Sequence, residues 1–147
     1  MKKLKVLVLA LICVLLVGCS KEKVVLTGAD FISKSKEAGF TASDITSNYK
    51  FAESAYMILS DFKVIFVESK NVYDIEGIFF DECNNINKSL TENGKYEAHN
   101  GKNWSTYEAT DMGDYYYVAL VDNTYMYVKG KPDNKERIKE FIDTMGY

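Results

Sequence analysis

Apolar side chains recur every three or four residues in three segments of the chain, a spacing that is typical of amphipathic helices. The most regular segment follows Asn71, a residue type that caps helix N-termini well, and Asp74 suits its first turn. Its apolar stripe comprises Val72, Ile75, Phe79, Cys83, Ile86 and Leu90. A weaker pattern begins at Thr27, which forms a capping box with Asp30, and it ends at Gly39. These patterns predict helices over residues 71–90 and 27–39.

The third helix is predicted near the C-terminus, where residues 132–134 start it and Gly146 ends it. Its stripe follows the i, i+3, i+4, i+7 spacing and comprises Ile138, Phe141, Ile142 and Met145.

Between the helices, short β-prone runs indicate strands that are joined by tight turns. Residues 55–59 and 64–67 flank a turn at 60–63, and residues 115–121 and 124–129 flank Asp122-Asn123. Single strands are predicted near residues 44–49 and 104–109. Residues 91–103 contain two Asn-Gly turn signals and no periodicity, which favours a loop or a minor hairpin.

The order of these elements is αβββ-αβββ-α, so we expect an α+β fold with an antiparallel sheet and helices mainly on one face. A constant offset of sixty-one residues also pairs similar positions in the two halves. The pairs are Tyr56 with Tyr117, Leu59 with Leu120, Asp61 with Asp122, Val67 with Val128, Lys70 with Lys131 and Phe80 with Phe141. An internal repeat is one interpretation; the other is that any two hairpin–helix units share apolar positions.

The second hairpin divides its side chains between two faces. One face carries Tyr117, Ala119, Val121, Met126 and Val128, a small and smooth set that suits helix packing. The other carries Tyr116, Val118, Leu120, Tyr125 and Tyr127. If this second face is open, Tyr116, Tyr125 and Tyr127 form a binding surface of rigid amphipathic rings; alternatively they complete a core or cover the sheet against a loop.

The N-terminus has the layout of a secretory signal. Three lysines precede the apolar run 6–17, which is shorter than the ~20 residues of a membrane-spanning helix. The run closes on Leu16-Val17-Gly18-Cys19, which resembles the bacterial lipobox. The resemblance implies cleavage between Gly18 and Cys19 and a diacylglyceryl group on the Cys19 thiol. Lipid on Cys19 would anchor the chain on the outer face of the cell membrane.

This interpretation divides the chain into a signal peptide (1–18), a lipidated cysteine with a short tether (19–26) and one α+β domain (27–147). Fully stretched, residues 20–26 reach about 20 Å, which keeps the domain close to the bilayer.

Charge and cysteine content narrow the function classes. Fifteen of the eighteen basic residues and all twenty-one acidic residues follow residue 18, so the mature net charge is −6. With Arg137 as its single arginine, the domain has no basic footprint for nucleic acid. Only Cys83 remains after cleavage and lipidation, which excludes an intramolecular disulfide.

Catalytic and metal-binding patterns are absent from the sequence, and no cofactor is implied. His99 is the only histidine, and Glu97 is its only close acidic neighbour, so we interpret it as a solvated loop residue. Cys83 lies on the apolar stripe of the second helix beside Asp81 and Glu82, which favours a buried structural thiol over a nucleophile. Asp81 and Glu82, with Asn84 and Asn85, are interpreted as a solvated helix face and not as metal ligands.

Residues 115–147 resemble the C-terminal part of small lipoproteins of low-GC Gram-positive bacteria. The shared pattern is a tyrosine-rich strand, an Asp-Asn-Thr turn (Asp122-Asn123-Thr124), an aromatic strand and a final helix that ends in Gly146-Tyr147. That family implies a compartment and a fold but no activity.

We therefore expect a non-enzymatic, lipid-anchored binding or accessory domain that contacts a protein, peptide or envelope component. Two alternatives remain open: an inhibitor similar in outline to PepSY domains or β-lactamase inhibitor proteins, and a hydrolase that uses the His99 loop.

Overall fold

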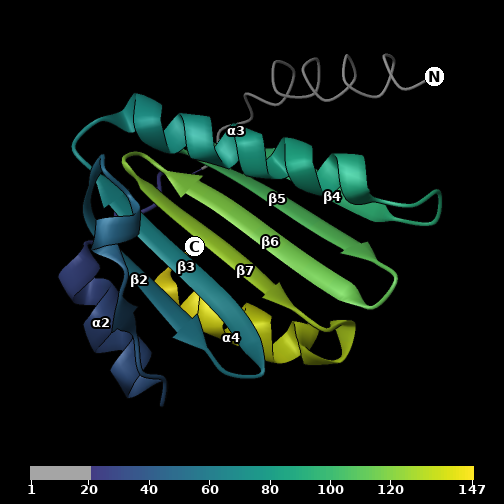
Figure 1. Ribbon diagram of the computed structural model, residues 1–147, viewed down its shortest axis with the longest axis horizontal. Coiled ribbons are helices and arrows are strands. Elements are labelled where there is room, and N and C mark those ends of the chain that lie inside the picture. The colour runs from purple at the N-terminus through teal and green to yellow at the C-terminus, as the bar shows by residue number, and fades with distance from the viewer. Residues whose placement is uncertain (1–20) are drawn as a thin grey trace.

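The computed structural model describes residues 21–147, so the predicted signal peptide and Cys19 lie outside the described residues. These residues form three α-helices and a seven-stranded sheet, whose arrangement is shown in Figure 1. The helices are α2 (Gly28–Glu37), α3 (Val72–Ser89) and α4 (Lys135–Met145), with short 3₁₀ turns at Thr46–Asn48 and Pro132–Asn134. The strands are β1 (Ser43–Asp44), β2 (Ala52–Leu59), β3 (Phe62–Ser69), β4 (Lys95–Asn100), β5 (Trp104–Asp111), β6 (Asp114–Val121) and β7 (Thr124–Gly130). The α+β class predicted from the sequence is confirmed.

The sheet is antiparallel throughout, with strand order β1-β2-β3-β7-β6-β5-β4. Neighbouring strands are joined by hairpins on each side of the centre. At the centre β3 pairs with β7, which unites the two predicted hairpins into one sheet. The paired residues of β3 and β7 lie far apart in sequence, so the register of this central pair depends on packing and not on a turn.

The predicted helix ends are confirmed. Thr27 and Asp30 form the reciprocal capping box of α2, and the Asn71 side chain accepts a hydrogen bond from the Tyr73 amide at the start of α3. Gly39 and Gly146 take left-handed φ angles of 84° and 85° just after their helices, where a residue without Cβ is favoured.

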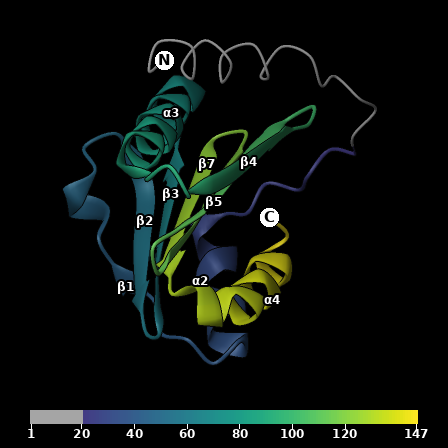
Figure 2. The same cartoon turned by 90° about the vertical axis from the view of Figure 1, so that its right-hand side faces the viewer.

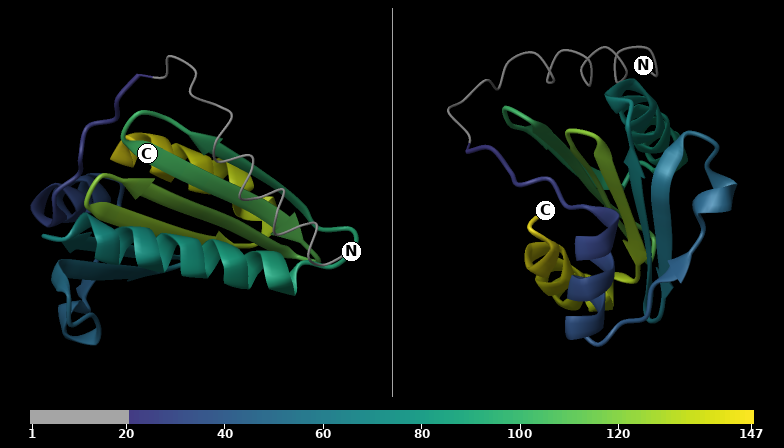
Figure 3. Two further views of the ribbon diagram at one scale, coloured as in Figure 1. Left: turned by 90° about the horizontal axis from the view of Figure 1, so that it is seen from above. Right: turned by 90° about the vertical axis from the view of Figure 1, so that its left-hand side faces the viewer.

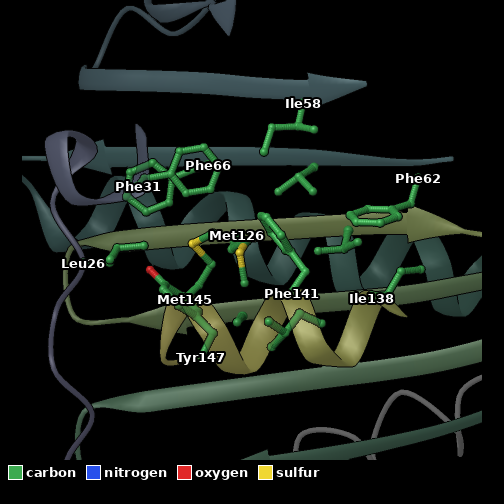
Figure 4. Packing of buried hydrophobic residues seen from close by; sticks show 14 of the residues in the cluster. Leu26, Phe31, Ile58, Phe62, Phe66, Met126, Ile138, Phe141, Met145 and Tyr147 are labelled. Carbon is green, nitrogen blue, oxygen red and sulfur yellow. The ribbon is translucent and has the colours of Figure 1, made fainter. Parts of the chain in front are cut away.

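Two helices, α2 and α4, cover one face of the sheet, and α3 covers the other (Figure 2). We call the first the α4 face and the second the α3 face. The α4 face holds the phenylalanine-rich core shown in Figure 4, in which Phe31 stacks on Phe66 at 4.6 Å between ring centroids. Phe141 of α4 meets Phe62 edge-on at 5.7 Å. The apolar stripe of α4 is buried here, as its spacing predicts: Ile138, Phe141, Ile142 and Met145.

The α3 face holds the second core. Ile75, Phe79, Cys83 and Ile86 of α3 are buried against it, and Val72 and Leu90 at the ends of the predicted stripe are not fully covered. Their sheet partners are Ala55, Val67, Tyr107, Ala109, Val118, Leu120 and Tyr125.

Two local predictions need correction. For residues 91–103 the loop alternative is wrong and the hairpin alternative holds in a larger form, because residues 95–100 form the outer strand β4, which pairs with β5 along its whole length. Its polar alternation hides it in the sequence, because an edge strand with little burial carries no apolar signal. The strand expected near residues 44–49 is only Ser43–Asp44, followed by a 3₁₀ turn.

The sixty-one-residue repeat does not hold in three dimensions. A two-fold axis perpendicular to the sheet would relate β2–β3 to β6–β7 and would leave both following helices on one face. Instead α3 and α4 lie on opposite faces, and Val67 and Val128, matched by the offset, are buried in different cores. Phe80 is 49% exposed whereas Phe141 is buried. The matched positions thus reflect the shared needs of two hairpin–helix units.

Residues 21–26 are not a free tether. Leu26 is buried in the phenylalanine-rich core, and the backbone of Lys23 is hydrogen-bonded to Asn103. Along residues 21–147, no helix combines the length and hydropathy needed to cross a membrane.

Candidate interaction surface

The register of the sheet places two rows of side chains side by side on the α3 face. In the first row Met57, Ile65 and Tyr127 are direct cross-strand partners. In the second row the partners are Leu59, Lys63, Lys129 and Tyr116. Directly paired residues share a face, so these seven side chains from β2, β3, β6 and β7 form one patch. We call it the tyrosine surface.

Burial falls steadily along the strands toward the tyrosine surface. The preceding row, Ala55, Val67, Tyr125 and Leu120, is buried beneath α3. Six of the seven residues of the tyrosine surface are only partly buried, and Leu59 is 67% exposed. Figure 1 shows the reason: α3 crosses the sheet obliquely and leaves the far ends of β2, β3 and β7 uncovered.

This geometry divides the three predicted tyrosines. Tyr116 and Tyr127 lie on the tyrosine surface, as a binding role requires. For Tyr125 the prediction of an open face is wrong, because Tyr125 is only 5% exposed and belongs to the core under α3. Strand alternation assigns the two faces of the hairpin correctly, but the position of the covering helix does not follow from the hairpin alone.

A small charged network orients Tyr116. Its hydroxyl donates a hydrogen bond to Asp114 Oδ2 at 3.0 Å. Lys129 Nζ lies 3.0 Å from the same oxygen and 5.1 Å from the centroid of the Tyr116 ring. The bond to Asp114 raises the pKa of Lys129. The Tyr116 ring is therefore held in place by both neighbours.

Glu82 of α3 stands at the border between covered and uncovered sheet. Partial burial raises its pKa, and the nearby positive charge of Lys63 opposes that rise. Burial and then the Glu82 charge raise the pKa of Tyr127 to about 12 and that of Tyr49 in the same direction. Glu82 is thus a half-buried carboxylate among tyrosines, which corrects its interpretation as part of a solvated face; Asp81, Asn84 and Asn85 are exposed as predicted.

His99 occupies β4, not a loop. Its Nε2 lies 3.5 Å from Glu97 Oε2, and both side chains are about 60% exposed. Across the sheet it pairs with Thr106, which places it on the α4 face. Cys83 is buried on the opposite face, where it lines a cavity of about 280 Å³ between α3 and β4–β5. The sheet therefore separates the histidine from the thiol. Within residues 21–147, no cluster of three histidine, cysteine or carboxylate side chains is arranged to hold a metal ion.

Sequence reasoning missed the contribution of the first hairpin to the surface. Met57, Leu59, Lys63 and Ile65 reach it only because β3 pairs with β7. The alternation of residues 62–69 was a usable signal for the face of each side chain, but nothing in it specifies which strand lies beside β3.

Known proteins add little to this geometry. No model of a protein family matches the chain, and no curated protein matches it. Among solved structures, a GTP binding regulator from Thermotoga maritima aligns with a TM-score of 0.49 and 14% sequence identity. The alignment covers 80% of this chain and 83% of the regulator. A likeness of this size carries no functional implication.

Proposed function

We propose that the protein is a lipoprotein of the outer face of the cell membrane, anchored by diacylglycerol on Cys19, and that it acts as a binding or accessory module without catalytic activity. Its recognition site is the tyrosine surface. The observation that supports this site best is the decrease in burial along one continuous sheet face: Tyr125 is buried, whereas Tyr127 and Tyr116 are only partly buried.

The chemistry of the surface indicates its partner. Tyrosine rings, Ile65 and Met57 offer apolar contact area, and rigid aromatic residues dominate many protein interfaces. Lys63 and Lys129 are cross-strand neighbours at its edge and add positive charge. A protein or peptide segment that combines apolar side chains with a carboxylate is the partner that this surface fits.

The anchor is tested by growing cells with a labelled lipid precursor. We expect label on the wild-type chain and none on the Cys19→Ala variant. Unlabelled wild-type protein, or label that persists on Cys19→Ala, would refute the anchor and leave the recognition site to be tested separately.

The recognition site is tested by photo-crosslinking on intact cells. A photoreactive residue at position 127 is expected to capture a specific partner, whereas one at Tyr73, which is 76% exposed on α3, is not. Adding Tyr116→Ser to the position-127 chain should abolish capture, and adding Tyr73→Ser as a matched control should not. Equal capture from positions 127 and 73 would count against the tyrosine surface.

A further inference from the structure

The segment that leads from Cys19 into the domain is held along its length by specific contacts. Asn103 binds the backbone of Lys23 on both sides: its Oδ1 accepts from the Lys23 amide and its Nδ2 donates to the Lys23 carbonyl, each at 2.9 Å. Trp104 Nε1 donates to the Lys21 carbonyl at 3.1 Å. A Lys102–Glu22 ion pair adds to these contacts. Residues 21–23 are therefore fastened to the loop before β5.

Side-chain packing reinforces the contact between residues 21–26 and the rest of the domain. The Lys23 ammonium lies 5.1 Å from the centroid of the Trp104 ring, and partial burial lowers the pKa of Lys23. Leu26 is only 4% exposed, in the core beneath α4. Asn103 also donates to Asp122 at 2.9 Å, which ties the segment to the β6–β7 turn. Figure 3 shows the segment passing along the end of the molecule where the chain also ends.

Fastening at Lys21 shortens the link to the anchor. Only two residue steps separate Lys21 from Cys19, a reach of about 7 Å. An unfastened segment from 20 to 26 would reach about 20 Å and would let the domain turn freely. The docked segment removes most of that freedom.

We propose that residues 21–26 are a docked spacer that holds the Trp104 end of the sheet against the lipid bilayer and points the tyrosine surface away from it. This inference rests on the anchor at Cys19 that is proposed above. The Trp104 end is thus expected to contact a bilayer surface, because the link between this end and the lipid-bearing residue is short.

Several exposed side chains at this end suit the surface of a neutral bilayer. Val72 at the start of α3 lines the same concavity as Lys102 and Trp104, together with the acidic Glu76 and Asp122. Val72 is 38% exposed, its neighbour Tyr73 is 76% exposed, and Val24 of the spacer is 87% exposed. Tyrosine and tryptophan are enriched at membrane–water interfaces, and lysine can keep its ammonium group in water while its aliphatic stem lies on apolar surface.

The tyrosine surface lies at the other end of the same strands. Trp104 pairs with Val121 of β6, and Tyr116 lies five residues earlier on that strand. At the rise of a β-strand this separation is about 17 Å along the sheet. A partner can therefore reach Tyr116 without competing with the bilayer.

Docking is tested first by hydrogen exchange on the purified mature chain in detergent. We expect the Lys23 amide to exchange at least tenfold more slowly than in the Asn103→Ala variant. Asn93→Ala, in the exposed loop after α3, is the matched control and should leave the rate unchanged. A Lys23 amide that exchanges as fast in the wild type as in Asn103→Ala would overturn the docked spacer.

Orientation is tested on the lipidated chain in vesicles whose headgroups carry a fluorescence quencher. Fluorophores are placed at Tyr73→Cys near the spacer and at Met112→Cys in the β5–β6 turn, where Met112 is 86% exposed. The unsubstituted chain measures any labelling of the buried Cys83. We expect the label at position 73 to be quenched several-fold more than the label at position 112. Asn103→Ala should reduce this ratio and Asn93→Ala should not.

The outcomes separate the two proposals. Equal quenching of the labels on vesicle-bound Tyr73→Cys and Met112→Cys chains would overturn the orientation while leaving the anchor intact. A mature chain that fails to float with vesicles would refute the anchor and the orientation together, and slow exchange at Lys23 would then still show a docked segment.

Discussion

The two faces of the sheet are closed in different ways. On the α4 face, two helices and the C-terminal Tyr147 enclose a core in which Phe31, Phe62 and Phe66 are almost completely buried. On the α3 face, one helix covers part of the sheet, and burial declines from Tyr125 to Tyr127. The first face is a core across the central strands β2, β3, β7 and β6, and it opens to solvent at the edge strand β4, where His99 lies. The second face is a core at one end and a surface at the other.

Simple dimensions account for this difference. Seven strands span roughly 29 Å between the outer strands, whereas a helix with its side chains is about 10 Å wide. One helix laid obliquely cannot cover the sheet, but two helices cover much more of it. The uncovered part of the α3 face is therefore a consequence of helix number, and tyrosine suits it because its ring packs on the sheet while its hydroxyl remains hydrated.

The largest expected effect comes from removing a buried ring from the core of the α4 face. Phe66→Ala removes a ring that is fully buried and stacked on Phe31, so we expect a loss of about 3–5 kcal/mol in the free energy of unfolding. Phe80→Ala removes a ring of the same size that is 49% exposed on α3, and it should cost much less. Urea denaturation of both variants measures the difference. Similar losses would mean that the α3 side is as tightly packed as the α4 face.

The next prediction compares two tyrosines on one strand. Tyr125→Ala leaves a cavity under α3, and we expect it to destabilise the fold by about 3 kcal/mol or more. Tyr127→Ala, two residues further and partly exposed, should cost roughly half as much. Thermal unfolding followed by circular dichroism tests the order. A larger loss of stability for Tyr127→Ala than for Tyr125→Ala would show that the core under α3 extends to the row of Tyr127.

Sequence reasoning succeeds here wherever burial is periodic and local. The stripe of α4 and the turn at Asp122-Asn123 are readable because each depends on residues a few positions apart. The separation of Tyr116 from Tyr117 onto opposite faces follows from the alternation of a strand in the same way.

What the sequence did not reveal depends on contacts between distant segments. The β3–β7 pairing joins residues about sixty positions apart, and the docking of Lys23 on Asn103 joins residues eighty positions apart. Neither leaves a local pattern. The covered state of Tyr125 has the same origin, since it depends on the path of α3 across the sheet.

The dependence of stability on alkaline pH tests how far Tyr127, at the border between the covered and uncovered parts of the α3 face, is buried. Burial raises the pKa of Tyr127 from its ordinary value of 10.0 to about 12, so the folded chain keeps this proton where the unfolded chain has lost it. The corresponding stability is present below pH 10 and declines as the pH rises toward 12. Tyr127→Phe has no proton to lose, so its stability should fall less between pH 10 and 12 than that of the wild type. Urea midpoints at pH 8, 10 and 11 measure this, and identical declines would mean that Tyr127 is fully hydrated.

The smallest expected effect concerns the charges that hold Tyr116. Lys129→Gln removes an ion pair with Asp114 in which both side chains are about 40% exposed, so we expect a change of only about 0.2–1 kcal/mol in stability. Added salt should reduce the difference between variant and wild type, because exposed pairs are screened. Partner capture through position 127 should nevertheless weaken, since the cation and the oriented ring both belong to the tyrosine surface. A variant that loses several kcal/mol would show that this end of the α3 face is a structural core, and a variant of unchanged stability and unchanged capture would remove Lys129 from the recognition site.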